Sequence, residues 1–116
     1  MSGQINVTTD GKVTKEIIRE GTGPVPKRGQ KVSVHYVGTL TNGKKFDSSR
    51  DRNQEFQFTV GQGVIAGWSA GVATMKVGEL SKFTIAPEYA YGNQGFPGLI
   101  PANSTLIFEI ELLRIL

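Results

Sequence analysis

Aromatic and glycine residues, rather than nucleophiles or metal ligands, are the most prominent candidates for chemistry in this sequence. The stretch YAYGNQGFPGLIP, Tyr89 to Pro101, contains three aromatic residues, three glycines and two prolines in 13 positions. A loop normally presents polar side chains to water. So large an apolar display predicts that this segment folds over the core or forms a wall of a binding pocket.

Candidates for covalent or metal chemistry are few. The chain has no cysteine and one histidine, which excludes disulfides, thiolate nucleophiles and cysteine-ligated zinc. His35 alternates with Val34 and Tyr36, which are expected to face inward, so we predict an exposed strand histidine rather than a catalytic one. No metal and no cofactor are predicted.

A glycine motif and two carboxylates remain as candidates. GQGVIA, residues 61–66, has the spacing of a dinucleotide-binding turn, but that motif requires a parallel βαβ unit, and the flanking strands have hairpin patterns. Asp47 either forms an ion pair with Arg50 or Arg52, or caps a turn, or takes part in a pocket. Glu88 follows a proline and is predicted to be exposed.

The ten aromatic residues exceed what the core of a small sheet requires. One interpretation is that most of them fill the core. The functional interpretation is a shallow aromatic bowl between a helix, the sheet and the 89–101 loop. The residues concerned are Tyr36, Phe46, Phe56, Phe58, Trp68, Phe83, Tyr89, Tyr91, Phe96 and Phe108.

Short strands separated by turns must position these side chains. Asn42-Gly43 is typical of a tight hairpin, and only residues 61–78 have apolar residues at helical spacing, among them Trp68. The pattern predicts an α+β domain: a five- to six-stranded twisted antiparallel sheet wrapped around one short helix. The predicted strands are 13–20, 31–40, 44–49, 55–60, 79–86 and 104–116. Residues 1–12 are expected to form a flexible tail, and 13–116 the domain.

Length and composition are typical of one soluble domain. The 116 residues are 38% apolar and 20% charged, as in ordinary globular proteins. No apolar run is long enough to span a membrane and the N-terminus lacks a secretory h-region, so we expect a cytoplasmic protein without a membrane partner. The net charge of +3 is scattered and does not favour nucleic acid as a partner.

Several long motifs, in the same order, resemble the FKBP family of macrolide-binding immunophilins with peptidyl-prolyl cis–trans isomerase activity. These motifs are VHYVGTLTNGKKFDSS, GVIAGW, YAYGNQGFPGLIP and TLIFEIELL. The resemblance covers about residues 14–115 and is closest to the small, single-domain cytosolic members. It implies the same fold that the strand and helix patterns predict.

The resemblance also implies a site. Trp68 would form the floor of a pocket, and Asp47 would lie at its rim in a polar cluster with Tyr36 and Arg52. The Ile65 N–H and the Tyr91 hydroxyl would donate hydrogen bonds to ligand carbonyls. Four residues would be catalytic: Asp47, Tyr91, Trp68 and Phe108. Those that would bind substrate or macrolide are Tyr36, Phe46, Arg52, Phe56, Val64, Ile65, Phe96 and Ile100. Phe96, at the loop tip where some members carry histidine, would alter substrate preference and macrolide contacts.

The implied function is isomerisation of Xaa–Pro bonds without a covalent intermediate, in support of protein folding. The partners would be proline-containing protein segments and macrolides such as rapamycin and tacrolimus, together with the protein targets of macrolide complexes; a monomer is expected. The alternative is a non-catalytic module that uses the same pocket to hold a partner protein. A chaperone that holds unfolded chains would require more apolar surface than the short 92–98 tip offers.

Overall fold

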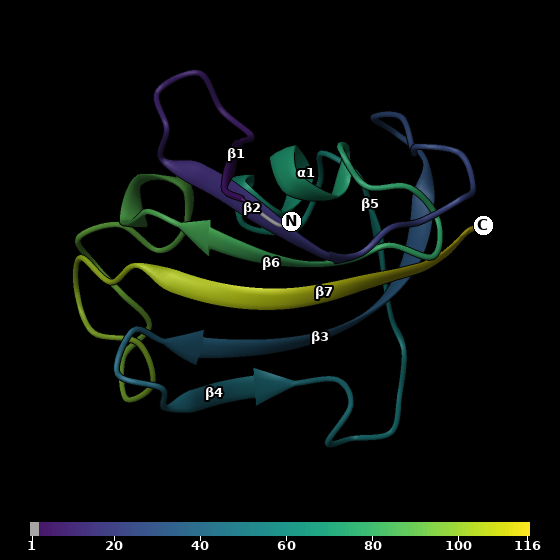
Figure 1. Ribbon diagram of the computed structural model, residues 1–116. Coiled ribbons are helices and arrows are strands. Elements are labelled where there is room, and N and C mark those ends of the chain that lie inside the picture. The colour runs from purple at the N-terminus through teal and green to yellow at the C-terminus, as the bar shows by residue number, and fades with distance from the viewer. Residues whose placement is uncertain (1–2) are drawn as a thin grey trace.

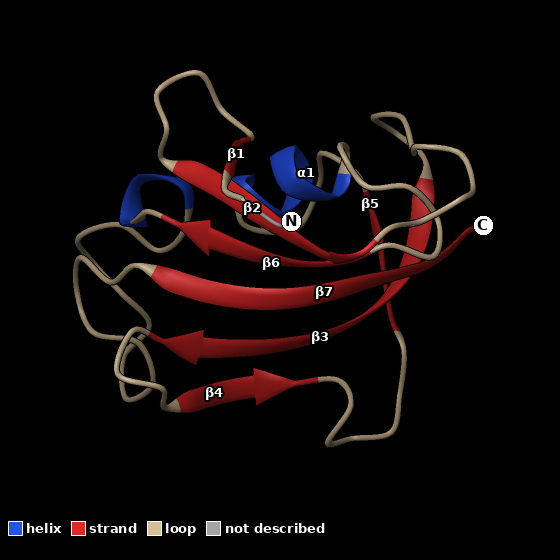
Figure 2. Cartoon of the chain, viewed as in Figure 1, coloured by secondary structure: helices blue, strands red, loops and turns tan. Residues whose placement is uncertain are grey.

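The chain folds as one antiparallel sheet that curves around a short helix (Figures 1 and 2). The computed structural model describes residues 3–116. Along the chain the elements are β1 (Ile5–Asn6), β2 (Val13–Arg19), β3 (Lys31–Leu40), β4 (Lys45–Ser48), β5 (Phe56–Thr59), α1 (Ala66–Val72), β6 (Leu80–Ile85), the 3-10 helix η1 (Pro87–Tyr89) and β7 (Leu106–Ile115). The predicted α+β class, with the sheet wrapped around one helix, is confirmed.

The sheet has seven strands in the order β1-β2-β6-β7-β3-β4, and β5 pairs with the other end of β3. The predicted count of five or six did not include β1, because the polar N-terminal residues have no alternating pattern. Ile5 pairs with Lys15 and Asn6 with Thr14. The division into a tail over 1–12 and a domain over 13–116 stays a prediction.

Strands β3 and β7 form the longest ladder of the sheet. Their ladder runs from Val32 opposite Ile115 to Leu40 opposite Leu106. The alternation predicted for the last strand is observed, since its inward face is buried. That face consists of Leu106, Phe108, Ile110 and Leu112. Because side chains alternate across a strand, this register places Phe108 on the same face as the helix.

The helix spans only seven residues, against the 61–78 predicted. Gly63 has φ 72°, a left-handed conformation that cannot continue a right-handed helix. Within α1, a Cβ on Gly67 would approach Ile85 to 2.5 Å, and one on Gly71 would approach Phe83 to 2.7 Å. These glycines lower helix propensity, but they let α1 lie directly against β6. Trp68 is thereby carried into the core.

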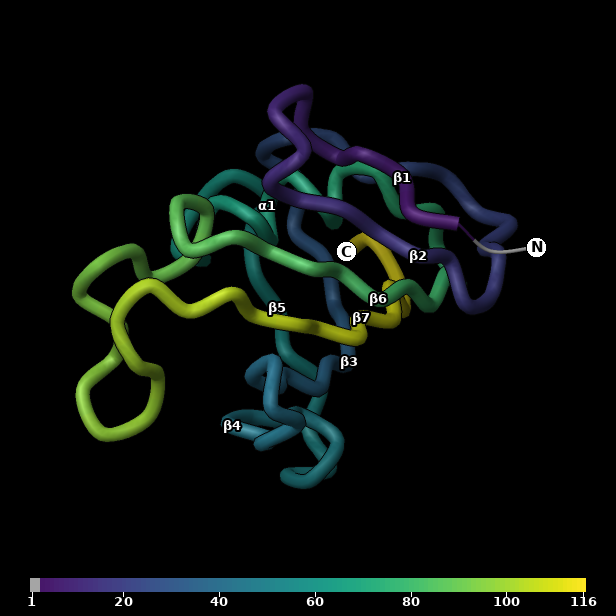
Figure 3. The backbone as a smooth tube through the Cα atoms, turned by 60° about the vertical axis from the view of Figure 1, so that its left-hand side comes forward, coloured from purple at the N-terminus to yellow at the C-terminus, as the bar shows by residue number. Residues whose placement is uncertain are grey.

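The segment that joins β6 to β7 contains η1 and the loop predicted to wall a pocket. In Figure 3 its yellow-green part projects from the sheet as an arm. Within residues 3–116, no helix has the length and apolar character required to cross a membrane.

Candidate functional site

An aromatic hollow of about 240 Å³ opens where the helix, the sheet and the β6–β7 loop meet. Strands β3, β4, β5 and β7 contribute to it, as do α1, the turn before α1 and the loop after η1. Its lining consists of Tyr36, Phe46, Asp47, Phe56, Gly63, Val64, Ile65, Trp68, Tyr91 and Phe108. Four larger depressions on the described surface each contain at most one phenyl ring. The 240 Å³ hollow, in contrast, has the composition of the predicted aromatic bowl.

Trp68 is enclosed by aromatic rings. Its ring centroid lies 4.9 Å from Tyr36 and 5.3 Å from Phe108, both edge-to-face, and 5.5 and 5.7 Å from Phe58 and Phe56. Only 4% of the residue is exposed. Within residues 3–116, its Nε1 is the one buried side-chain nitrogen or oxygen without a hydrogen-bond partner. Ring packing, rather than hydrogen bonding, therefore fixes the indole.

The contact between Phe46 and Phe108 in the lining depends on a glycine that the sequence analysis did not single out. A Cβ on Gly38 would lie 2.7 Å from both the Phe46 and the Phe108 rings. Because Gly38 has no Cβ, the Phe46 and Phe108 rings form an edge-to-face pair with their centroids 5.5 Å apart. A glycine inside a strand often marks such a close approach, and this was the available signal in the sequence.

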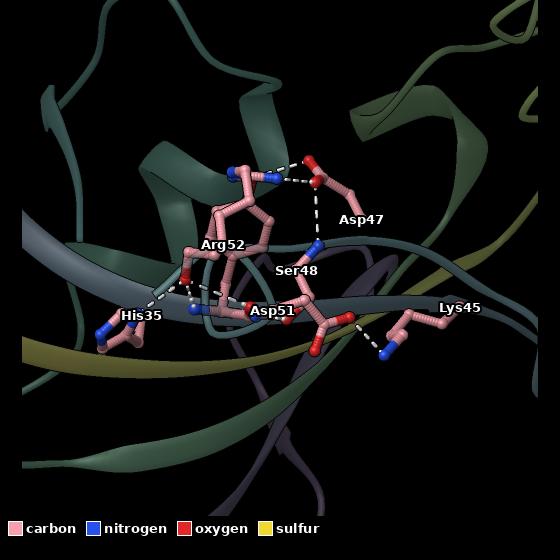
Figure 4. A network of polar contacts seen from close by, with 8 residues as sticks. His35, Lys45, Asp47, Ser48, Asp51 and Arg52 are labelled. Carbon is pink, nitrogen blue, oxygen red and sulfur yellow. Dashed lines mark hydrogen bonds and ion pairs between the residues drawn. The ribbon is translucent and has the colours of Figure 1, made fainter. Parts of the chain in front are cut away.

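One corner of the hollow is polar. The Tyr36 hydroxyl donates to Asp47 Oδ2 at 2.6 Å. Arg52 donates to Asp47 Oδ1 at 2.5 Å and to the Tyr36 hydroxyl at 2.9 Å. The Ser48 N–H donates to Asp47 Oδ1 at 2.8 Å (Figure 4). Of the two arginines considered for Asp47, Arg52 is the partner, whereas Arg50 pairs with Glu111.

These contacts determine the charge of the corner. Burial alone would raise the pKa of Asp47, but the hydrogen bonds from Tyr36 and Arg52 outweigh it and hold the pKa below its ordinary value. Burial, together with the bond to Asp47, raises the pKa of Tyr36. At neutral pH the corner therefore holds a carboxylate anion and a neutral phenol. Neither group is poised to exchange a proton there.

Besides Trp68 Nε1, the Ile65 N–H and the Tyr91 hydroxyl of the hollow have no hydrogen-bond partner among residues 3–116. Ile65 caps α1, and its carbonyl accepts from the N–H groups of Trp68 and Ser69, but its own N–H donates to no described acceptor. The Tyr91 hydroxyl is also unpaired, and the residue is 38% exposed. Donors of this kind could bind carbonyl oxygens of a ligand.

Three residues assigned to binding lie beside the hollow rather than in its lining. Arg52 reaches it through Asp47 and Tyr36. Phe96 is half-exposed and packs against Tyr91 with ring centroids 5.9 Å apart. Ile100 is buried and bridged to Phe96 by backbone hydrogen bonds.

Of the other sequence candidates, His35 and Glu88 lie outside the hollow, whereas the GQGVIA turn contributes Gly63, Val64 and Ile65 to its lining. His35 Nδ1 lies 2.9 Å from Ser49 Oγ, and the histidine is partly buried instead of exposed (Figure 4). Glu88 is exposed, as predicted, and its carboxylate pairs with Lys12. The GQGVIA turn follows β5, which pairs antiparallel with β3, so the parallel unit of a dinucleotide site is absent at this motif.

Comparisons with known proteins identify related chains. A family model described as FKBP-type peptidyl-prolyl cis-trans isomerase matches residues 23–113. "Peptidyl-prolyl cis-trans isomerase FKBP1A" of Xenopus laevis is 57% identical over 105 residues, covering 89% of this chain and 97% of the relative. "Peptidyl-prolyl cis-trans isomerase Fkbp12" of Drosophila melanogaster is 60% identical over 91 residues, covering 78% and 84%. "FK506-binding protein 1" of Dictyostelium discoideum is 58% identical over 98 residues, covering 84% and 92%.

Proposed function

The chain belongs to the FKBP-type peptidyl-prolyl cis-trans isomerase family, and on that premise we propose that its aromatic hollow binds a prolyl residue and accelerates rotation about the preceding peptide bond. The observation that supports this role most strongly is the composition of the hollow. An indole enclosed by rings lies beside the unpaired Ile65 N–H and Tyr91 hydroxyl, and the lining contains no serine, threonine, cysteine, lysine or histidine.

The reaction requires no bond to be made or broken at the protein. Rotation about a peptide bond is opposed by amide resonance, with a barrier of about 18–20 kcal/mol. Uncatalysed prolyl exchange takes tens of seconds. Turnover at about 100 per second would require the barrier to fall by about 5 kcal/mol. That amount is within reach of differential binding alone.

The hollow suits a twisted amide better than a planar one. When the bond rotates, resonance is lost and the carbonyl becomes less polar. A low-polarity site therefore costs the twisted state less than the planar state. Trp68, Tyr36 and Phe108 pack edge-to-face around this space. In our proposal they hold the pyrrolidine ring.

The polar groups of the hollow would orient the substrate. The Ile65 N–H and the Tyr91 hydroxyl would bind the carbonyls that flank the proline. Asp47 would act as a fixed anion, because Tyr36 and Arg52 already satisfy its carboxylate. An apolar residue before proline should be preferred, since Phe46 and Val64 form an apolar wall.

The same hollow would bind FK506-type macrolides. Relatives named "FK506-binding protein 1" support this. Tacrolimus and rapamycin would occupy the prolyl space, with Phe96 and Ile100 at its margin. Protein targets of a macrolide complex, a monomeric state and a cytoplasmic location remain predictions from the sequence.

The experiment is NMR exchange spectroscopy of a peptide with a single Phe–Pro bond, with and without the protein. We expect accelerated exchange that rapamycin abolishes, and unchanged acceleration by the Lys27→Ala variant, which alters an exposed loop residue. Titration of Trp68 fluorescence with the same peptide measures binding independently. Binding without acceleration would refute the isomerase proposal and favour the non-catalytic module.

A further inference from the structure

The turn between β1 and β2 contacts the start of the loop that carries Tyr91. In Figures 1 and 3 this purple turn stands beside the green segment that contains η1. The Ala86 N–H donates to the Lys12 carbonyl at 2.8 Å. Lys12 Nζ donates to Glu88 Oε2 at 3.0 Å, and the Tyr89 hydroxyl donates to Asp10 Oδ2 at 2.9 Å. Three positions within residues 86–89 are thus held by one turn.

The turn itself is well defined. Asp10 Oδ1 accepts from the Thr8 hydroxyl at 2.6 Å and from the Lys12 N–H at 3.0 Å. The Val7 N–H donates to the Val13 carbonyl at 2.8 Å, and the Val7 side chain packs against the core. Contacts within the turn therefore orient the Asp10 carboxylate, and its second oxygen, Oδ2, accepts from the Tyr89 hydroxyl.

The held segment leads directly into the hollow. Tyr89 and Ala90 pack against the core. The Pro87 carbonyl accepts from the N–H groups of both Ala90 and Gly92, which closes a turn around Tyr91. Ala90 has φ −128° and ψ −117°, outside the common helical and extended regions. The direction of the Tyr91 side chain therefore depends on how residues 87–90 are held.

We propose that residues 7–12 form a strut for the pocket loop, and that Asp10 is a positioning residue that acts through Tyr89 to orient Tyr91. The inference rests on the proposed function, because Tyr91 is one of the two donors assigned to the substrate. The strut precedes residues 23–113, the part of the chain that the family model matches.

Loss of the Asp10–Tyr89 contact should weaken substrate binding moderately and leave global stability nearly unchanged. Asp10 and Lys12 are exposed, and exposed polar contacts contribute little to global stability. Changes along a physically connected network alter a distant site by modest factors. We expect Asp10→Ala and Tyr89→Phe each to raise KM for the Phe–Pro peptide by about 3-fold, with kcat and the denaturation midpoint nearly unchanged.

Three variants test the route. The double variant Asp10→Ala/Tyr89→Phe should have the KM of the Asp10→Ala variant, because both substitutions remove the same Tyr89–Asp10 hydrogen bond. In a Tyr91→Phe background, Asp10→Ala should have no further effect on KM. Glu20→Ala, which removes another exposed carboxylate from the N-terminal part of the chain, should match the native protein.

The outcome can be separated from that of the proposed function. Peptide affinity from Trp68 fluorescence and the NMR signals of the Tyr91 ring report on positioning even if the protein does not accelerate exchange. Weaker affinity and shifted Tyr91 signals in Asp10→Ala and Tyr89→Phe, but not in Glu20→Ala, would support the strut. Native affinity and native Tyr91 signals in both variants would overturn it, as would additive effects in the double variant.

Discussion

Substitution of Trp68 separates its role as the floor of the hollow from its role in the core. The indole is 4% exposed and packs against four aromatic rings. Trp68→Ala should therefore lower the free energy of unfolding by about 3–5 kcal/mol. Trp68→Phe keeps one ring and removes the unpaired Nε1–H, whose burial costs about 1–3 kcal/mol. The packing lost with the second ring of the indole lowers the free energy of unfolding, and removal of the unpaired N–H raises it. Because the two effects oppose each other, Trp68→Phe should lower the free energy of unfolding by about 1 kcal/mol or less.

The two variants should also differ in catalysis. If the floor contributes about 2 of the roughly 5 kcal/mol that catalysis requires, Trp68→Ala should lower kcat/KM about 30-fold. Trp68→Phe retains an apolar aromatic floor and should lose only a few-fold. The loss should be shared by every substrate, because in our proposal Trp68 contacts the proline rather than the residue before it.

The assay combines NMR exchange of a single Phe–Pro peptide with urea unfolding followed by far-UV circular dichroism, since both variants lack the only tryptophan. Lys27→Ala serves as the matched control. A folded Trp68→Ala protein with native kcat/KM would refute the assignment of the floor. Equal destabilisation in Trp68→Phe and Trp68→Ala would show that burial of the unpaired indole N–H does not lower the stability of the native protein.

Further predictions concern charge. Asp47→Val should reduce kcat/KM only modestly, because the carboxylate moves no proton in our account; complete loss in the same exchange assay would indicate acid–base chemistry. The lowered pKa of Asp47 means that its bonds stabilise the fold above its unfolded pKa, about 3.9, and that this contribution is lost as pH falls through the lower folded value. In urea unfolding, the contribution of Asp47 to the free energy of unfolding should therefore be constant from pH 7 to about 5 and should decline below about pH 4. Asp47→Asn should abolish this decline. A decline that starts near pH 6 would contradict the prediction. Lys15 and Glu79 form a buried ion pair, with side chains 7% and 2% exposed. Lys15→Met should lower the unfolding free energy by about 3–5 kcal/mol, against about 1 or less for Lys45→Met in an exposed pair; equal losses would show that Glu79 finds another partner or becomes hydrated.

The strands of this protein were largely predictable, and the helix was not. In β3 and β7 the alternation of apolar and polar residues is a local property, and both strands lie within two residues of the predicted bounds. Helix α1 was predicted too long, because the apolar spacing around Trp68 extends past its ends. The spacing does not reveal that Gly63 adopts a left-handed conformation.

Polar partners were the least predictable feature. Lys15 lies on an inward position of β2, and its partner Glu79 is 64 residues away. Glu111 accepts from both Arg19 and Arg50, which precede it by 92 and 61 residues. Such pairs depend on strand register across the sheet, which no local pattern encodes.

Residue types and periodicity alone predicted an α+β domain, which the structure confirms, and an aromatic site without cysteine chemistry. The long motifs were sufficient to indicate the family. The tertiary structure decided which rings enclose Trp68, that Gly38 lets Phe46 and Phe108 meet, and that Asp10 reaches Tyr89. These contacts join residues far apart in the chain. They exist only once the sheet has closed around the helix, because burial and register are properties of the whole fold rather than of any segment.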